Sequence, residues 1–267
     1  MPRNMAYEAS SLGEDLLWEL MRRGSLAMEV AERTKDNVYA VFHGHLVPVA
    51  QEPLLTPFSV SLSSQGPVEV SFEGNFVILT AHAQPLSIGR PGESPGEIKG
   101  WPELVKLASV LGSLLRGDLD LHVSRLALKL LEEGWPDPEA VIEGAQRYVG
   151  AGAGSTPSFD DFLAGYITGW GRSLQARLDL SNTTHLSRAI LSEVLADRDY
   201  LVEVARVREC AKGRGDLLHH SLRVASMGGS SGIFMLLGVT SALLQRVGEK
   251  DVLLELWRSI GGTHRSP

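Results

Sequence analysis

The sequence predicts an α+β protein in which a mainly β N-terminal domain precedes an all-α helical bundle. Three observations support this. Apolar and polar residues alternate through the first third of the chain, Gly and Pro crowd residues 85–102, and apolar residues recur at helical spacing after Trp101. We therefore expect a β domain over residues 1–90 with a short leading helix, a Gly/Pro linker over 91–100, and a helical domain over 101–267.

The β prediction rests on short segments in which every second residue is apolar. These segments cover residues 26–30, 38–42, 58–62, 68–72 and 76–79, and Glu73, Gly74 and Asn75 have the composition of a hairpin turn between the last two. A segment with one apolar helical face, residues 13–22, precedes them. We expect about five strands, arranged as an antiparallel sheet or a small barrel.

The helical prediction begins at residue 101. Apolar spacing indicates helices from there to residue 149, with Asp137 and Pro138 as a start signal. Further helices fit residues 159–176, 184–195, 201–211, 216–227, 233–247 and 252–260. This part should form a bundle of roughly eight or nine helices.

Composition narrows the classes of partner and compartment. The formal net charge of −7 argues against nucleic acid and anionic membranes, which attract basic proteins, but a small anionic substrate remains compatible with it. The one cysteine, Cys210, allows no internal disulfide and fits a core position better than a nucleophile. The first 15 residues lack the apolar core of a signal peptide, and the apolar stretch 233–244 is too short to cross a bilayer, so we expect a cytoplasmic protein.

The strongest functional signal is the glycine-rich segment 150–161. Its alternating glycines permit positive φ angles and close approach to a ligand, and Thr156 followed by Pro157 predicts a helix N-cap and first helical residue. A helix N-terminus attracts anions, so the segment suits phosphate or carboxylate. It lacks the lysine of a nucleotide P-loop and the preceding strand of a dinucleotide fold. The binding candidates are Gly150, Gly152, Gly154, Ser155, Thr156 and Ser158.

Asp160 and Asp161 follow in the first turn of the expected helix. Either residue could simply favour the helix dipole, or it could bind a metal ion or act as a base beside a bound anion. Adjacent helical residues point about 100° apart, so we expect one to face the loop and the other to fix the backbone. These are the catalytic candidates. Gly165 and Gly169, four residues apart, predict close helix packing.

Two further polar clusters precede helices. They are residues 181–184 and residues 228–232. The second cluster, 228–232, could be an ordinary interhelical turn. It also matches the hydrolase pattern G-x-S-x-G at Ser230, but it lacks the preceding strand that this pattern needs. Convergence of the clusters on one pocket is a hypothesis. Thr184 should cap the helix that follows it. The binding candidates from these clusters are Thr183, Thr184, Gly228, Gly229, Ser230, Ser231 and Gly232.

Metal binding has weak support. His43 and His45 are expected on one strand face as a ligand pair, but no third ligand of matching spacing is evident. We predict no cofactor and leave a divalent metal ion as an open alternative.

The order of these motifs resembles the AllH-like family, long filed as a domain of unknown function. Residues 150–165 read G-x-G-x-G-S-T-P-S-F-D-D-F-L-x-G, close to the family's glycine loop. Thr183, Thr184 and Ser187 resemble its T-T-x-x-S stretch, and residues 228–232 its G-H-[ST]-S-G cluster. The resemblance implies a subunit of an oxamate carbamoyltransferase, which interconverts carbamoyl phosphate and oxamate with oxalurate and phosphate in purine (allantoin) catabolism. Partner subunits or a homo-oligomer would then be expected.

Four positions depart from the family pattern. Ser155 replaces leucine, Phe159 replaces glycine, Gly229 replaces histidine and Phe234 replaces aspartate. Loss of an imidazole and a carboxylate would alter acid–base and metal chemistry. A non-catalytic subunit that binds a small anion or a nucleotide is therefore an alternative, and so are purely structural loops.

Overall fold

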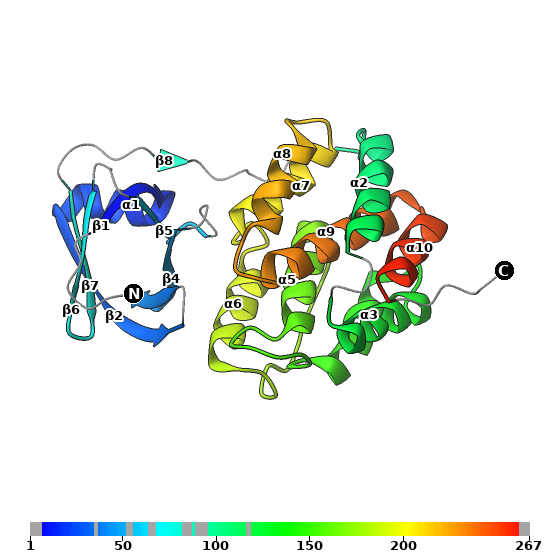
Figure 1. The fold of residues 1–267 in the computed structure, drawn as a ribbon, viewed down its shortest axis with the longest axis horizontal. Helices are drawn as coiled ribbons and strands as arrows, with labels where there is room; N and C mark the ends of the chain where they lie inside the picture. Colours follow the sequence, from blue (N-terminus) through cyan, green and yellow to red (C-terminus); the bar gives the residue numbers. More distant parts are fainter. Residues whose placement is uncertain are drawn as a thin grey trace. The chain divides into compact units, whose positions relative to one another are not determined.

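The computed structural model describes residues 7–34, 37–51, 56–63, 68–81, 87–88, 96–115 and 119–261. The chain forms two compact units (Figure 1). One comprises Met1–Pro91 with Tyr200–Glu203, and the other comprises Gly92–Asp199 with Val204–Pro267. Residues 91–95 of the expected linker lie outside the described residues.

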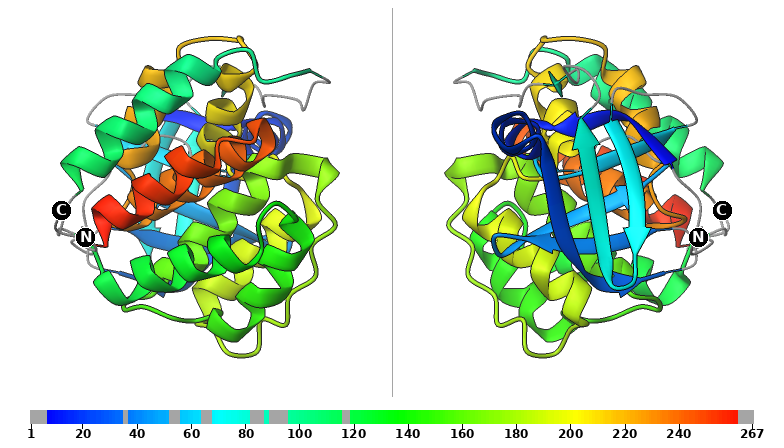
Figure 2. Two further views of the ribbon diagram at one scale, coloured as in Figure 1. Left: turned by 90° about the vertical axis from the view of Figure 1, so that its right-hand side faces the viewer. Right: turned by 90° about the vertical axis from the view of Figure 1, so that its left-hand side faces the viewer.

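The first unit is a curled β-sheet with one helix. The strand order is β5-β4-β3-β2-β7-β6-β1-β8, and β5 also pairs with β1, so seven strands curl round on themselves (Figure 2). Neighbouring strands are antiparallel except in the β4–β5 and β1–β8 pairs. The elements are β1 (Tyr7–Gly13), α1 (Glu14–Arg23), β2 (Ser25–Arg33), β3 (Val38–Phe42), β4 (His45–Ala50), β5 (Val60–Ser63), β6 (Val68–Glu73), β7 (Phe76–Ala81) and β8 (Ser87–Ile88).

Alternating burial explains the sheet. Along β2, Leu26, Met28 and Val30 point into the core while the residues between them are exposed, as a period of two requires. The β6–β7 hairpin turns at Gly74, whose φ of 59° favours glycine, and Glu73 pairs with Phe76 across the turn. The predicted hairpin is confirmed, as is the α+β class.

The strand prediction missed β1 and β4. β1 is short of large apolar residues, and β4 contains Pro48, which lowers strand propensity although it pairs with Tyr39 in register. The predicted His43–His45 pair is wrong. His43 has a φ of 50° in the turn between β3 and β4, whereas His45 begins β4, so the two residues do not alternate along one strand.

The second unit is all-α, as predicted. None of the helices in the described part of the chain is long and apolar enough to span a bilayer. The predicted helix 159–176 ends early, because Gly171 adopts a φ of 64° and a short 3₁₀ turn follows. The helices are α2 (Trp101–Leu114), α3 (Leu121–Glu133), α4 (Pro138–Ala145), α5 (Ser158–Trp170), α6 (His185–Ala196), α7 (Val202–Ala211), α8 (Leu217–Ala225), α9 (Ser231–Val247) and α10 (Lys250–Ile260).

Helices α5 and α9 pack with unusually close backbones at the centre of this unit (Figure 1). A Cβ atom at Gly165 would lie 2.0 Å from the carbonyl oxygen of Met235, and one at Gly238 would lie 2.1 Å from that of Phe162. Only glycine fits at such contacts, so the predicted packing role of Gly165 is confirmed. Gly169 also faces α9, 2.7 Å from the Cβ of Ala242 by the same measure.

Candidate functional site

The glycine loop that precedes α5 depends on glycine for geometric reasons. Gly150, Gly152 and Gly154 have φ angles of 86°, 111° and 99°. A Cβ at Gly150 would lie 2.2 Å from the carbonyl oxygen of Asn182, and one at Gly152 would lie 2.7 Å from the amide nitrogen of Ser158. The loop therefore runs directly against the segment before α6 and against the first residue of α5.

The amides of this loop fall into a paired group and an unpaired group. At the base, Gly150 N donates to Asp160 Oδ1 at 2.8 Å, Ala151 N to Tyr148 O at 2.9 Å, and Phe159 N to Ala151 O at 3.0 Å. The tip, Gly152 to Gly154, is exposed. Among the described residues, no acceptor is bonded to the amides of Gly152, Ala153, Gly154, Ser155, Thr156 and Ser158.

The start of α5 differs from the predicted cap by one residue. The helix begins at Ser158, with Pro157 in the N-cap position and no side-chain cap. Thr156, the predicted cap, instead places its Oγ1 2.9 Å from Ser231 Oγ at the start of α9. Backbone carbonyls replace the side-chain cap, because Phe159 N donates to Ala151 O and Asp160 N donates to Pro157 O, and the Ser158 amide is left open.

Asp160 holds the loop together. Its carboxylate accepts hydrogen bonds from Gly150 N at 2.8 Å, from the Thr183 hydroxyl, and from Ser187 Oγ at 2.7 Å. The side chain is 1% exposed. The three donors come from the loop, from the segment before α6 and from α6 itself. Asp160 therefore links these segments and is the member of the acidic pair that fixes the backbone.

Asp161 lies in a different environment. It is 3% exposed, and its Oδ2 has no hydrogen-bond partner among the described residues. Burial raises the pKa of this carboxyl well above its ordinary value. The charge of Asp160 adds to the increase, while the hydroxyls of Ser231 and Thr156 oppose it. Asp161 is thus a carboxyl that favours its neutral form, beside two hydroxyls from two separate loops.

Three helix N-termini meet at this place. Thr184, the N-cap of α6, accepts from Ser187 N at 3.1 Å and donates to Ser155 O at 2.5 Å, so the predicted cap is confirmed. The contact between Thr156 and Ser231 brings in α9. The positive ends of the α5, α6 and α9 dipoles are therefore close together, which favours negative charge there.

The remaining members of the second cluster shape the backbone. Gly228 and Gly229 have φ angles of 45° and 57°, and Ser230 makes no capping bond. A Cβ at Gly232 would lie 2.0 Å from Val224 O, so this glycine serves helix packing. Ser231 is the member of this cluster whose hydroxyl reaches the glycine loop.

Two of the four departures from the family pattern lie in the core. Phe159 is fully buried, with its ring 5.5 Å from that of Tyr148 and 5.7 Å from that of Phe162. Phe234 is also fully buried. Gly229, by contrast, is exposed. Phe159 therefore fills the core where the family pattern has glycine, and Phe234 gives apolar packing where that pattern has a carboxylate.

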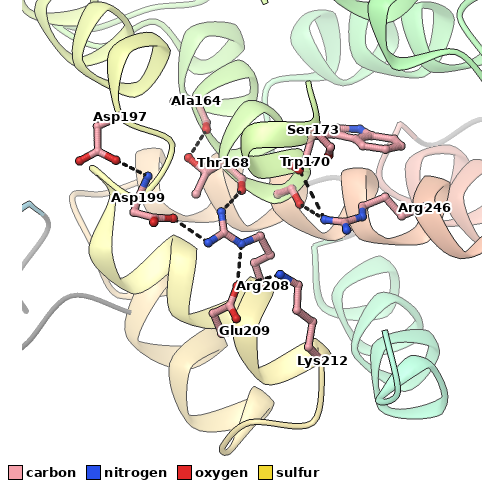
Figure 3. Close-up of polar contacts among 11 residues, drawn as sticks. Ala164, Thr168, Trp170, Ser173, Asp197, Asp199, Arg208, Glu209, Lys212 and Arg246 are labelled. Carbon is pink, nitrogen blue, oxygen red and sulfur yellow. Dashed lines mark hydrogen bonds and ion pairs between the residues drawn. The ribbon is translucent and has the colours of Figure 1, made fainter. Parts of the chain in front are cut away.

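The far end of α5 is held by arginines that sequence reasoning did not identify (Figure 3). Arg208, fully buried on α7, donates to Thr168 O at 3.0 Å and pairs with Asp199 at 2.6 Å and Glu209 at 3.0 Å. Arg246 donates to Gly169 O at 3.2 Å. Cations at the C-terminal carbonyls complement the helix dipole, so α5 is fixed at the end opposite the loop. A charged residue in an amphipathic stretch gives no sequence signal for such burial.

No group of three His, Cys, Asp or Glu residues that could hold a metal ion occurs in the described residues.

Comparison with known proteins gives one match. The model of the family described as oxamate carbamoyltransferase subunit AllH matches residues 148–243. No curated protein and no solved structure gives a significant match. The matched stretch contains all three polar segments that meet at the N-termini of α5, α6 and α9, and it confirms the resemblance seen in the motifs. Residues 148–243 of this chain are therefore similar to the AllH family of oxamate carbamoyltransferase subunits.

Proposed function

We propose that the chain is a subunit of an enzyme of the oxamate carbamoyltransferase type and that its glycine loop binds the small anionic group of a substrate. The observation that carries this proposal is the set of unpaired amides in the loop from Gly152 to Thr156 and at Ser158, the first residue of α5, with the unpartnered Asp161 oxygen beside them. The family match supports the reaction class.

The physical chemistry favours an anion. Amides that no protein group accepts are available to a phosphate or carboxylate, and hydrogen bonds to a charged acceptor contribute about 1.5–3 kcal/mol each. Three helix N-termini add a positive potential in a partly buried place. The phosphate of carbamoyl phosphate and the carboxylate of oxamate both meet this requirement.

Asp161 gives the proposal a chemical step. Because its pKa is raised, the carboxyl is a proton donor that does not repel a neighbouring anion. When the oxamate nitrogen attacks the carbamoyl carbon, a C–N bond forms and the C–O bond to phosphate breaks. Asp161 would give its proton to the departing phosphate oxygen and recover one from the attacking nitrogen, while the loop amides stabilise the developing charge.

One observation favours a second candidate, a non-catalytic anion-binding subunit. Gly229 stands in the cluster 228–232 where the family pattern has an imidazole. The buried Phe234 on α9 stands where that pattern has a carboxylate. In that case the loop would bind the anion and a partner subunit, or another copy of this chain, would supply the chemistry. In either case we expect a cytoplasmic protein without nucleic-acid partners.

The test measures ligand binding and turnover separately. Calorimetry with carbamoyl phosphate, phosphate and oxamate should show saturable binding to the isolated chain. Gly152→Ala should weaken it at least tenfold, because a Cβ there would lie 2.7 Å from Ser158 N and cover that amide. Gly248→Ala is the matched control. Its φ of 81° is also positive, but a Cβ there meets no atom within 4 Å.

Three results are decisive. Binding with turnover supports the enzyme, and binding without turnover supports the partner subunit. If none of the three anions binds the wild-type chain, or if Gly152→Ala binds them as well as Gly248→Ala does, the loop is a structural connection and the proposal fails.

A further inference from the structure

A groove between α2 and α8 lies apart from the glycine loop. It is formed by Lys99, Gly100 and one face of α2, by the α7–α8 loop and by the start of α8, and its cavity volume is about 610 Å³. This volume is in the range of small-molecule sites, roughly 300–1,000 Å³. We call it the α2–α8 groove. It shares no residue with the three polar segments at the α5, α6 and α9 N-termini.

The floor and walls of the α2–α8 groove are apolar. Leu107, Cys210 and Leu217 form a buried floor, each less than a tenth exposed. Val110 and Leu218, which also line it, are 49% and 60% exposed. Two large aliphatic side chains are thus exposed to water at the edge of the groove. A ligand that buried them would gain about 25 cal/mol per Å² of apolar surface removed from water.

The α7–α8 loop lines one side of the groove. Gly213 and Gly215 have φ angles of 85° and 113°, and a Cβ at Gly215 would lie 3.1 Å from Cys210 Sγ. Gly100 N donates to Ala211 O at 2.9 Å and joins the start of α2 to the end of α7. This hydrogen bond joins the two sides of the groove.

The rim of the groove carries two lysines and two acids, and both acids lie at helix N-termini. Lys99 and Lys106 are exposed and have no ion-pair partner in the described residues. Of the two acids at the rim, Asp216 is engaged in capping α8, since it accepts from His219 N at 3.0 Å. Glu103 stands in the first turn of α2, where the helix dipole stabilises it. The two lysines are thus the groups that remain available to an anionic ligand.

We propose that the α2–α8 groove binds an amphipathic monocarboxylate, with its apolar chain or ring on the Leu107–Leu217 floor and its carboxylate between Lys99 and Lys106. An apolar body accounts for the exposed Val110 and Leu218, and an acidic head accounts for the unpaired lysines. Small-molecule sites commonly combine such apolar walls with a few polar groups that fix orientation.

Calorimetry with octanoate on the full chain tests the proposal. One octanoate per chain should bind saturably, octan-1-ol at least tenfold more weakly, and octylamine not measurably. The double variant Lys99→Gln with Lys106→Gln should lower octanoate affinity at least tenfold. Val110→Trp should abolish binding by filling the groove, whereas Leu114→Trp, an exposed position on the same helix that does not line the groove, should leave binding unchanged.

Protection of Cys210, the one cysteine of the chain, from alkylation would locate the bound octanoate independently. Because Cys210 is on the groove floor, octanoate should slow its alkylation by iodoacetamide severalfold, as measured by mass spectrometry of the intact chain. Gly152→Ala should leave octanoate binding intact, which separates this site from the anion loop. The proposal is overturned if octanoate does not bind, if octylamine binds equally well, or if Val110→Trp and Leu114→Trp behave alike.

Discussion

The same substitution at two adjacent residues, Asp160→Asn and Asp161→Asn, should have opposite consequences for stability. Asp160 accepts three hydrogen bonds as a carboxylate, and asparagine offers one carbonyl oxygen and an NH₂ group in its place. The NH₂ group would then face either Gly150 N or the hydroxyls of Thr183 and Ser187, so at least one donor loses its acceptor. Asp161 has an unpartnered oxygen and a carboxyl that favours its neutral form, so an amide of the same shape fits there.

The magnitude follows from the contacts. A hydrogen bond to a charged group contributes about 1.5–3 kcal/mol and a neutral one about 0.5–1.5, so neutralising the acceptor of three bonds costs roughly 3 kcal/mol. Gly150 and Thr183 are half-buried and water can replace part of the loss, which leaves about 2 kcal/mol. At about 2–4 °C per kcal/mol, Asp160→Asn should lower Tm by roughly 4–8 °C. Asp161→Asn should be at least as stable as wild type at pH 7, because folded wild type keeps a proton that the unfolded chain releases.

The assay is urea denaturation followed by circular dichroism at pH 7, with carbamoyl phosphate binding measured on the folded proteins. We expect Asp160→Asn to be destabilised, and Asp161→Asn to be at least as stable as wild type but impaired in turnover, if this chain catalyses. Equal destabilisation of the two variants, or a stable Asp160→Asn, would refute the division into a structural and a functional carboxyl.

Three further outcomes follow from the same structure. Gly165→Ala should cost about 1–3 kcal/mol in urea denaturation, because its Cβ would lie 2.0 Å from Met235 O, and an unchanged midpoint would contradict the close packing of α5 and α9. Arg208→Met should cost about 3–5 kcal/mol by the same assay, since it leaves Asp199 buried without its cation, and a loss below about 1 kcal/mol would contradict this account. Asp161→Asn should gain stability relative to wild type as pH rises above about 4, because native wild type keeps a proton that the unfolded chain releases; a pH-independent difference would disprove the raised pKa.

Much of the scaffold could be predicted because local chemistry determines it. The Gly74 turn and the Thr184 cap each depend on one residue and its immediate neighbours, and each is confirmed. The close packing at Gly165 is also confirmed, although its contact lies on α9. β1 was missed because its strand character comes from pairing with β5 and β6, which lie far along the chain.

The parts of the site that sequence could not predict depend on partners distant in sequence. That adjacent aspartates point apart follows from helix geometry, but which of them meets Ser187 depends on where α6 packs. The displaced cap has the same cause, since Thr156 is drawn to Ser231, 75 residues away. Burial of Arg208 is equally non-local, because its partners lie on α5 and on the segment before α7.

The hydrogen bonds of Asp160 bear on the proposal that the glycine loop binds a small anion. The fold already places one carboxylate where three helix N-termini meet, and it satisfies that carboxylate with an amide and two hydroxyls. Burial is the main cause of the raised pKa of Asp161, and repulsion by the Asp160 charge adds to it. An incoming anion experiences the same repulsion, so it should bind at the exposed amides of Gly152–Gly154, away from Asp160 and beside a protonated Asp161. Anion affinity should then fall as Asp161 ionises, and this pH dependence would distinguish the loop from a site governed by helix dipoles alone.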